Sequence, residues 1–578
     1  MKGSINSNKI LHDINYDNYI VQYRGDIESE ISGYQDSYVI IINDKYAIVS
    51  VKKDVEINLD KTSYFRTIEY VNPPAMFTLQ NISPIEASKV SAVQLGTPLN
   101  LTGKGVNVAI IDTGIDYLSE EFLDLNGKTR IDCIWDQTII SSEQSENNPV
   151  PFGTLYTRDK INDAITASKE GKSPYEIVPS KDEIGHGTNM AGIIGAAGKN
   201  PKLKGVAPEC NFVVVKLIEA LSYKAEFDDI TVPVFNISSI FTALQFLYEY
   251  YQSNYTPLVI YLPLGSPLGN HDGNGLLEQF IDSLLTNNGI ALVTGTGNER
   301  NTGGHTSGFL AEIGTVNVPA AGNIELEVAP EQKHLWIEVW CDYPNVVLVE
   351  IVSPSGESTN AIPITLNRTN TYIFSFEKTI VKVNYYIPEE NTGDELIRLR
   401  FSKLQPGLWK IRLNASYVLN GRYNAWMSQK GIAANGTRFT FADPFGTVTN
   451  PANSIYPIVV AAYNQNNNTV VDYSGTTSLT AIIDRIDVAA GGVNALTVAP
   501  NNTTSVVNGT SVSAAIVAGI SALIFNWGII NGIEKYMFCQ TLRAYLEKGV
   551  VTRSGDVSPN PYWGYGFLNI PKLFENIT

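Results

Sequence analysis

The middle of the chain alternates nearly continuous apolar runs with segments of helical periodicity. Four runs have few polar positions: VNVAIID (106–112), NFVVVKLI (211–218), LVIYLPL (258–264) and IALVTGT (290–296). Strands that are covered on both faces show this pattern, because neither side of the strand meets water. Helical periodicity lies between the runs, at 187–197 and 237–252. The alternation predicts an α/β fold, in which helices cover both faces of a parallel sheet.

Two regions interrupt this alternation. Residues 1–80 carry short strand patterns and end in the pair Pro73-Pro74, which cannot continue a helix or a central strand; they predict a small N-terminal α+β unit. Residues 322–440 carry short β-branched and aromatic runs with no helical pattern between them, which predicts an all-β sandwich or jelly roll. The α/β pattern resumes with IVVAAY (458–463), so the β unit is predicted to be an insertion.

The predicted organisation therefore has four segments. Residues 1–80 form the N-terminal unit, 81–321 the first part of the α/β domain, 322–440 the insertion and 441–578 the second part of the α/β domain. A length of 578 residues agrees with several domains.

Composition excludes some classes of function. A net charge of −17 offers no basic stripe to neutralise phosphates, so we expect no nucleic-acid partner. The four cysteines lie far apart without a CxxC spacing, so we expect unpaired thiols, no metal and no cofactor. The N-terminus has no apolar core of a secretory signal, and we recognise no run that approaches eighteen apolar residues, so we expect no membrane span.

Three short segments carry candidate chemistry. AIIDTGID places Asp112 at the end of a buried strand, DEIGHGTNMAG places His186 between glycines at a helix start, and NGTSVSAA places Ser511 at a helix N-terminus. A serine hydroxyl attacks a carbonyl only if a base takes its proton, and histidine titrates near neutral pH. An aspartate orients the imidazole and stabilises its charged form. We expect the glycines beside His186 to leave room for a substrate.

A fourth residue, Asn298 in GTGNER, follows a buried strand and a Gly-x-Gly turn. Its amide is a candidate donor to the oxyanion of a tetrahedral intermediate, together with the backbone N–H of Ser511. One such donor contributes about 3 kcal/mol of transition-state stabilisation.

The order Asp, His, Ser, with the motifs DTG, HGT and GTSxSA, resembles the subtilisin-like serine proteases (subtilases) over residues 81–320 and 445–578. The resemblance implies a serine endopeptidase and an N-terminal chaperone-inhibitor that the enzyme removes itself. Residues 1–80 fit that pro-domain, with FTLQ (77–80) in the substrate cleft and self-cleavage between Gln80 and Asn81. A small domain of unrelated function is the alternative for residues 1–80.

The resemblance also implies a first specificity pocket. Its rim would be Leu264 and Gly265, facing Thr294, Gly295 and Thr296, and Pro263 stands where the family has a serine. This small, weakly polar lining favours an uncharged residue at the cut site. Many subtilases bind calcium in the loop after the histidine helix, but three lysines occupy that loop here, so we expect no metal there: Lys199, Lys202 and Lys204.

The absent secretory signal, the pro-domain and the inserted jelly roll together resemble the Csp family, the germination subtilases of anaerobic spore formers. This implies a monomeric protease located in the spore, which activates a cortex-hydrolase zymogen by limited proteolysis. Two alternatives stay open: a general degradative subtilase and a regulatory pseudoprotease that binds partners without cutting. The insertion either braces the enzyme or docks the zymogen, and its aromatic-rich strands favour bracing.

Overall fold

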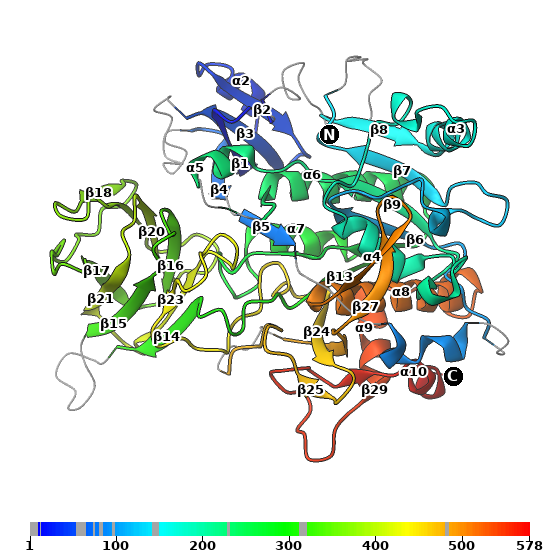
Figure 1. Ribbon diagram of the computed structural model, residues 1–578. Helices are drawn as coiled ribbons and strands as arrows, with labels where there is room; N and C mark the ends of the chain where they lie inside the picture. Colours follow the sequence, from blue (N-terminus) through cyan, green and yellow to red (C-terminus); the bar gives the residue numbers. More distant parts are fainter. Residues whose placement is uncertain are drawn as a thin grey trace.

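The computed structural model describes residues 10–11, 13–53, 65–72, 76–79, 85–94, 99–140, 150–227, 230, 232–310, 321–479 and 485–577. Figure 1 shows an N-terminal sheet, a central α/β body and a β unit to one side of it.

The central body is built on an eleven-stranded mixed sheet. Eight strands are parallel, in the spatial order β7 (Ile131–Asp136), β9 (Asn211–Lys216), β6 (Asn107–Asp112), β11 (Leu258–Tyr261), β13 (Ile290–Gly295), β24 (Ile458–Asn464), β26 (Val488–Gly491) and β30 (Phe567–Leu568). Three short strands pair antiparallel with this array: β8 (Thr154–Thr157), β25 (Thr469–Val470) and β29 (Val550–Val551). The four apolar runs of the sequence all lie in the parallel part, and their side chains are buried.

The apolar runs of the sequence did not predict the parallel strand at the edge of this array. The segment IDCIWD forms β7 and extends the sheet beyond β9. β8 and helix α3 (Arg158–Lys169) follow it. The strand is short and carries Asp132 and Asp136, so the apolar run that marks a buried strand is broken.

Helices cover both faces of the sheet, as predicted. They are α4 (His186–Gly195), α6 (Ile237–Asn254), α7 (Leu276–Leu284), α8 (Thr510–Phe525), α9 (Cys539–Lys548) and α10 (Ile570–Ile577). Helix α8 continues as a π-helical turn to Ile530, and residues 510–530 are long and apolar enough to span a bilayer. This run is longer than the sequence analysis recognised. Most of it is buried inside the protein, and a helix that is apolar all round is typical of a protein core.

The N-terminal unit is a four-stranded antiparallel sheet with the order β2 (Ser37–Ile41), β3 (Tyr46–Lys52), β1 (Tyr16–Tyr23) and β4 (Ile68–Asn72). Its described residues include the short helix α2 (Ile27–Ile31). Tyr46 packs on α6 and α7, with its ring centroid 5.5 Å from that of Phe241 and 5.3 Å from that of Phe280. The unit therefore docks on the central body through an aromatic contact, with α6 and α7 between the two sheets (Figure 1).

The inserted unit consists of two antiparallel sheets. The six-stranded sheet has the order β14 (His305–Phe309), β22 (Arg422–Met427), β16 (Leu335–Cys341), β20 (Glu395–Ser402), β19 (Ile380–Tyr386) and β18 (Asn370–Ile373). The four-stranded sheet has the order β17 (Val346–Val352), β21 (Gly407–Tyr417), β15 (Ala321–Val328) and β23 (Arg438–Phe439). Strand β14 belongs to this unit although it precedes residue 322. Buried side chains such as Trp409 fill the space between the sheets.

The chain enters and leaves the inserted unit at adjacent points. The N–H groups of Met427 and Phe439 donate to the carbonyls of Gly304 and Gly303 at 2.9 and 2.8 Å, and the N–H of Asp443 donates to the carbonyl of His305 at 2.8 Å. The incoming and outgoing segments are thus joined by backbone hydrogen bonds.

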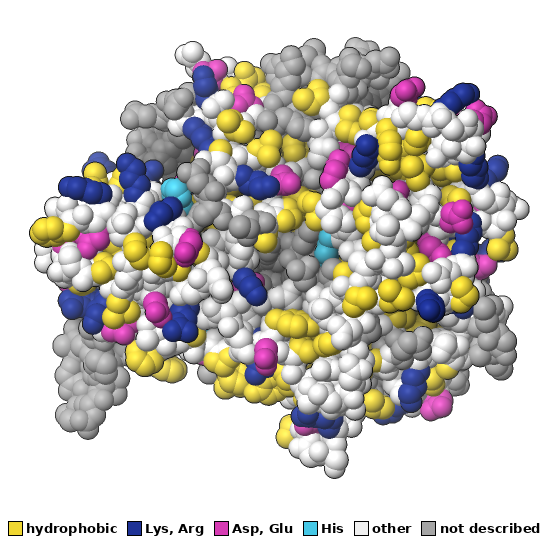
Figure 2. Space-filling view, in the orientation of Figure 1, with side chains coloured by type: hydrophobic (Ala, Val, Ile, Leu, Met, Phe, Trp, Pro, Cys, Tyr) yellow, Lys and Arg dark blue, Asp and Glu magenta, His cyan; other side chains and the backbone are white. Residues whose placement is uncertain are grey.

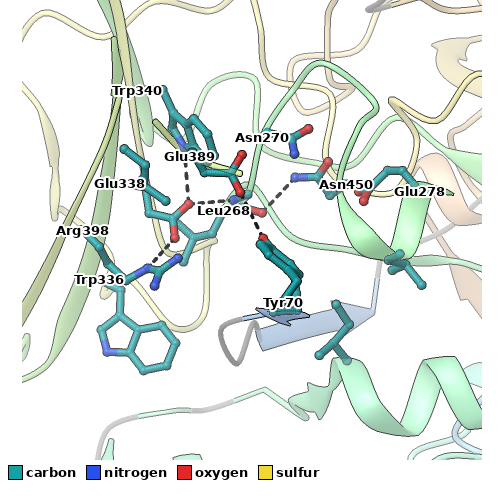
Figure 3. A pocket seen from close by; sticks show the side chains of 16 residues that line it. Tyr70, Leu268, Asn270, Glu278, Trp336, Glu338, Trp340, Glu389, Arg398 and Asn450 are labelled. Carbon is teal, nitrogen blue, oxygen red and sulfur yellow. Dashed lines mark hydrogen bonds and ion pairs between the residues drawn. The ribbon is translucent and has the colours of Figure 1, made fainter. Parts of the chain in front are cut away.

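The three parts of the molecule meet around a small cavity of about 70 Å³ (Figure 3). The hydroxyl of Tyr70, from β4, donates to Glu389 of the inserted unit at 3.0 Å. Glu338 accepts from Arg398 at 2.9 Å and from the N–H of Gly269, in the central body, at 2.9 Å. Arg398 and Glu338 both belong to the inserted unit and are buried, so water hardly screens their ion pair. The N–H of Gly269 joins the central body to this pair.

All four cysteines are buried and unpaired with each other. On the face shown in Figure 2, Lys and Arg side chains are interspersed with Asp and Glu side chains and do not form a single patch.

Candidate active site

Asp112 and His186 meet at the carboxyl end of the main sheet. Asp112 is the last residue of β6 and His186 is the first of α4. His186 Nδ1 lies 2.7 Å from Asp112 Oδ2 and 2.9 Å from Oδ1. The N–H of Thr113 donates to Oδ1 at 2.7 Å. Because the carboxylate accepts the proton of Nδ1, Nε2 of the neutral imidazole is left to accept a proton.

Gly187 explains how α4 comes so close to β6. A Cβ at this position would lie 2.0 Å from the carbonyl oxygen of Gly114 and 3.2 Å from the Cβ of Asp112. The sequence analysis assigned the glycines beside His186 to substrate access. For Gly187 the structure gives another reason, because only glycine lets the first turn of α4 touch the loop after β6.

Asp182, a buried carboxylate that the sequence analysis missed, stabilises the contact between the loop after β6 and helix α4. It accepts from the N–H of Gly185, from Thr113 Oγ1, and from both the N–H and the hydroxyl of Thr188, at 2.7–2.8 Å. Thr113 Oγ1 in turn accepts from the N–H of Gly187 at 3.0 Å. Asp182 therefore joins the loop after β6 to the first turn of α4. The only signal in the sequence is its position four residues before His186.

Ser511 lies in the first turn of α8, and its side chain is fully buried. Its Oγ has no hydrogen-bond partner within the described part of the chain. Gly509, the N-cap, has φ = 136°, a backbone conformation that favours glycine. Helices α4 and α8 pack against each other.

Tyr261 connects Ser511 to Asp112. The tyrosine hydroxyl, at the end of β11, donates to the carbonyl of Ser511 at 2.7 Å. Burial, and secondly the charge of Asp112, raise the pKa of Tyr261 well above its usual value, so the hydroxyl stays protonated and remains a donor. Strand β11 pairs with β6, and Tyr261 lies opposite Ile110, two residues before Asp112. The structure thus gathers Asp112, His186 and Ser511 at one end of the sheet.

Asn298 is held by the residue before Ser511. Its Oδ1 accepts from the N–H of Thr510 at 3.2 Å and from the Thr510 hydroxyl at 3.3 Å. With Oδ1 engaged in this way, the Nδ2 hydrogens are the donors that the side chain can offer to a ligand. Asn298 follows β13, the neighbour of β11 in the sheet.

If Asn298 is the oxyanion donor that the sequence predicts, replacing it by alanine is expected to lower kcat for hydrolysis of a peptide substrate by about 10²–10³-fold. KM should change little, since the donor acts mainly on the transition state. Steady-state kinetics on a peptide substrate would measure both. Asn254→Ala, at the exposed end of α6, is the control. An unchanged kcat for Asn298→Ala would exclude this role.

Strand β5 (Met76–Leu79) lies between two strands of the central body. Leu79 and Thr78 pair antiparallel with Leu264 and Gly265 of β12, and Phe77 and Met76 pair with β10 (Phe235–Asn236). The backbone of β5 is therefore the central strand of a three-stranded sheet. Gln80 and Asn81, the predicted cleavage point, lie outside the described residues.

The predicted pocket residues occupy two segments. Pro263 precedes β12, whose Leu264 and Gly265 hold β5, while Thr294 and Gly295 end β13. Sequence reasoning missed a further segment. The N–H of Thr449 donates to the carbonyl of Thr296 at 3.1 Å, and Asn450 pairs with Ser266, so residues 449–450 connect the two predicted sides.

The loop after α4 is folded around a carboxylate. The N–H groups of Gly198, Lys199 and Asn200 donate to Glu121 at 2.7–3.1 Å. The backbone donors of this loop thus converge on a carboxylate. The same loop carries the three lysines.

Comparisons with known proteins agree with this geometry. The subtilase family profile matches residues 103–359 and 432–566, more than half of the chain. The CspB protease of Clostridium perfringens is similar at 27% identity and a TM-score of 0.74, over 85% of this chain and 97% of that one. Fervidolysin of Fervidobacterium pennivorans, a keratinolytic enzyme related to subtilisin, matches at 13% identity and a TM-score of 0.47, over 97% of this chain and 61% of its own. Among curated proteins nothing matches. The chain belongs to the subtilase family and is a subtilisin-like serine peptidase.

Proposed function

We propose that Ser511 is the nucleophile, His186 the general base and acid, Asp112 the residue that orients it, and Asn298 an oxyanion donor. One observation carries this assignment. The buried His186–Asp112 pair lies at the same end of the sheet as the Ser511 hydroxyl, which stands at a helix N-terminus and has no hydrogen-bond partner among the described residues.

In the proposed reaction His186 Nε2 takes the proton of Ser511 Oγ as Oγ bonds to the substrate carbonyl carbon. The negative charge on the former carbonyl oxygen is stabilised by Asn298 Nδ2 and the Ser511 N–H. The imidazolium, stabilised by Asp112, then gives its proton to the leaving amine, and the C–N bond breaks. Water then attacks the acyl-enzyme with His186 as the base. The carboxylic acid product leaves and the Ser511 hydroxyl is regenerated.

We further propose that residues 1–80 are a pro-domain that the enzyme cuts between Gln80 and Asn81. The antiparallel pairing of β5 with both β10 and β12 supports this, because a peptide bound as an added strand presents its backbone in an extended form. The aromatic contact of Tyr46 and the Tyr70–Glu389 hydrogen bond favour a cut segment that stays bound in the cleft.

Purification of the unsubstituted chain tests the cleavage. N-terminal sequencing and intact mass are expected to give a mature chain that begins at Asn81, together with an 80-residue fragment that co-elutes with it. A mature chain with another N-terminus, or an uncut chain, would refute this cleavage site.

The biological proposal is limited proteolysis in germination, by a monomer located in the spore. Similarity to a CspB protease supports it. Incubation with a purified cortex-hydrolase zymogen should give one shortened product, whereas casein should stay largely intact. Extensive casein cleavage would favour a general degradative subtilase. Cleavage of neither protein would favour a regulatory pseudoprotease, although the intact His186–Asp112 pair weighs against that reading.

A further inference from the structure

A cavity of about 340 Å³ lies directly beside Asn298. One wall comes from the central body, through residues 298–304 and the pair Asp472 and Tyr473. The other wall comes from residues 427–437 of the inserted unit. The described residues that define the catalytic chemistry and the first specificity pocket, Asn298 excepted, do not line it.

We infer that this cavity binds the residues that follow the scissile bond, so that the inserted unit forms part of the substrate site. The inference rests on the proposed protease function and deepens it, because it assigns substrate recognition to a unit whose aromatic-rich strands indicated bracing.

The order of the strands places the cavity on the leaving side. Tyr473 follows β25, which pairs with the carboxyl end of β24. Asn298 follows β13 and Leu264 follows β11, in a sheet where β24, β13 and β11 are successive neighbours. Strand β5, whose direction leads toward the proposed cut, lies on the β11 side. A peptide that crosses Ser511 extends on both sides of the oxyanion donor, so its later residues run toward the β24 side and the cavity.

Both walls are fixed with respect to the reacting groups. The N–H of Lys430 donates to Glu299, the neighbour of Asn298, at 3.1 Å, and burial raises the pKa of the Glu299 carboxyl. On the opposite wall the hydroxyl of Tyr473 donates to the carbonyl of Gly492, which also accepts from the N–H of Gly509 at 3.2 Å. The first contact ties the inserted unit to the oxyanion donor, and the second ties Tyr473 to the loop before Ser511.

The lining indicates the chemistry of the occupant. Amides and hydroxyls predominate, Met427 and Tyr473 add apolar surface, and Lys430 and Asp472 contribute one charge of each sign. The volume is that of a small ligand pocket, so more than one residue fits. The cavity therefore matches an extended peptide segment with uncharged polar side chains.

Two substrates with the same residues before the cut would test the inference. One ends in p-nitroanilide and has no residues after the cut, and the other continues for four polar residues with a quenched fluorophore. Asn435→Trp, on the exposed lip of the cavity, is expected to lower the ratio of kcat/KM for the extended substrate to that for the anilide by about tenfold.

Lys430→Glu should lower kcat/KM for an extended substrate with aspartate after the cut relative to one with lysine. Thr371→Trp, exposed on β18 of the same unit, should leave both ratios unchanged.

Each outcome bears on one claim. If Asn435→Trp and Lys430→Glu, with thermal unfolding like that of the unsubstituted chain, leave these ratios unchanged, or if Thr371→Trp changes them equally, the subsite is refuted. If the unsubstituted chain hydrolyses neither substrate and does not cut itself between Gln80 and Asn81, the protease function itself fails, and the inference falls with it.

Discussion

Replacing Ser511 by alanine is expected to lower kcat for peptide hydrolysis by about 10⁶-fold and to leave the chain uncut at Gln80–Asn81. The reason is that no other hydroxyl holds the same position at the start of α8. Ser513 donates instead to the carbonyls of Ala490 and Gly491, at 3.1 and 3.0 Å. Because the Ser511 Oγ has no hydrogen-bond partner in the described structure, its removal should cost little stability.

A denaturing gel of both purified proteins, followed by steady-state kinetics, would measure the two effects. Ser521→Ala is the matched control, since Ser521 is buried in the same helix and donates only to the carbonyl of Val517, at 2.7 Å. A Ser511→Ala protein that still cuts itself or a peptide would show that the nucleophile lies elsewhere.

Asp112→Asn is expected to lower kcat by about 10⁴-fold while the protein stays folded. An asparagine amide can donate to Nδ1 of His186, which moves the imidazole proton to Nε2, where a base must be free to accept one. The kinetics of peptide hydrolysis near neutral pH would show the loss, and a thermal unfolding curve would show that the fold is retained. Asp159→Asn, the same change on the exposed first turn of α3, serves as the control. A loss of tenfold or less would mean that Asp112 does not set the tautomer.

The central strands could be predicted from sequence because a strand that is buried on both faces consists of consecutive apolar residues. β6, β9, β11 and β13 are unbroken apolar runs, and each was found within a few residues of its ends. β7 was missed because Asp132 and Asp136 interrupt its apolar pattern. In the inserted unit the sequence indicated only the all-β class, since short strands with one half-exposed face carry a weaker pattern.

In the candidate site, too, residues in local motifs could be predicted and contacts between distant segments could not. Asp112, His186, Ser511 and Asn298 stand in short motifs, so their types and order could be read locally. The contacts of Asp182 and Tyr261 could not, because each joins segments that are distant in sequence, and a carboxylate that accepts four hydrogen bonds looks like any loop aspartate. The same holds for Gly187, whose neighbour across the contact, Gly114, lies on another element.

The paired entry and exit segments of the inserted unit have a consequence for how the whole chain folds. β13 and β24 are adjacent in the sheet, yet about 160 residues separate them. Closing so long a flexible connection would carry an entropic penalty that grows with the logarithm of its length. If the unit forms first, its two ends are already side by side at Gly303–His305, and the remaining gap closes like that of a short loop. The nucleophile-bearing helix could then assemble onto the sheet almost as if the insertion were absent.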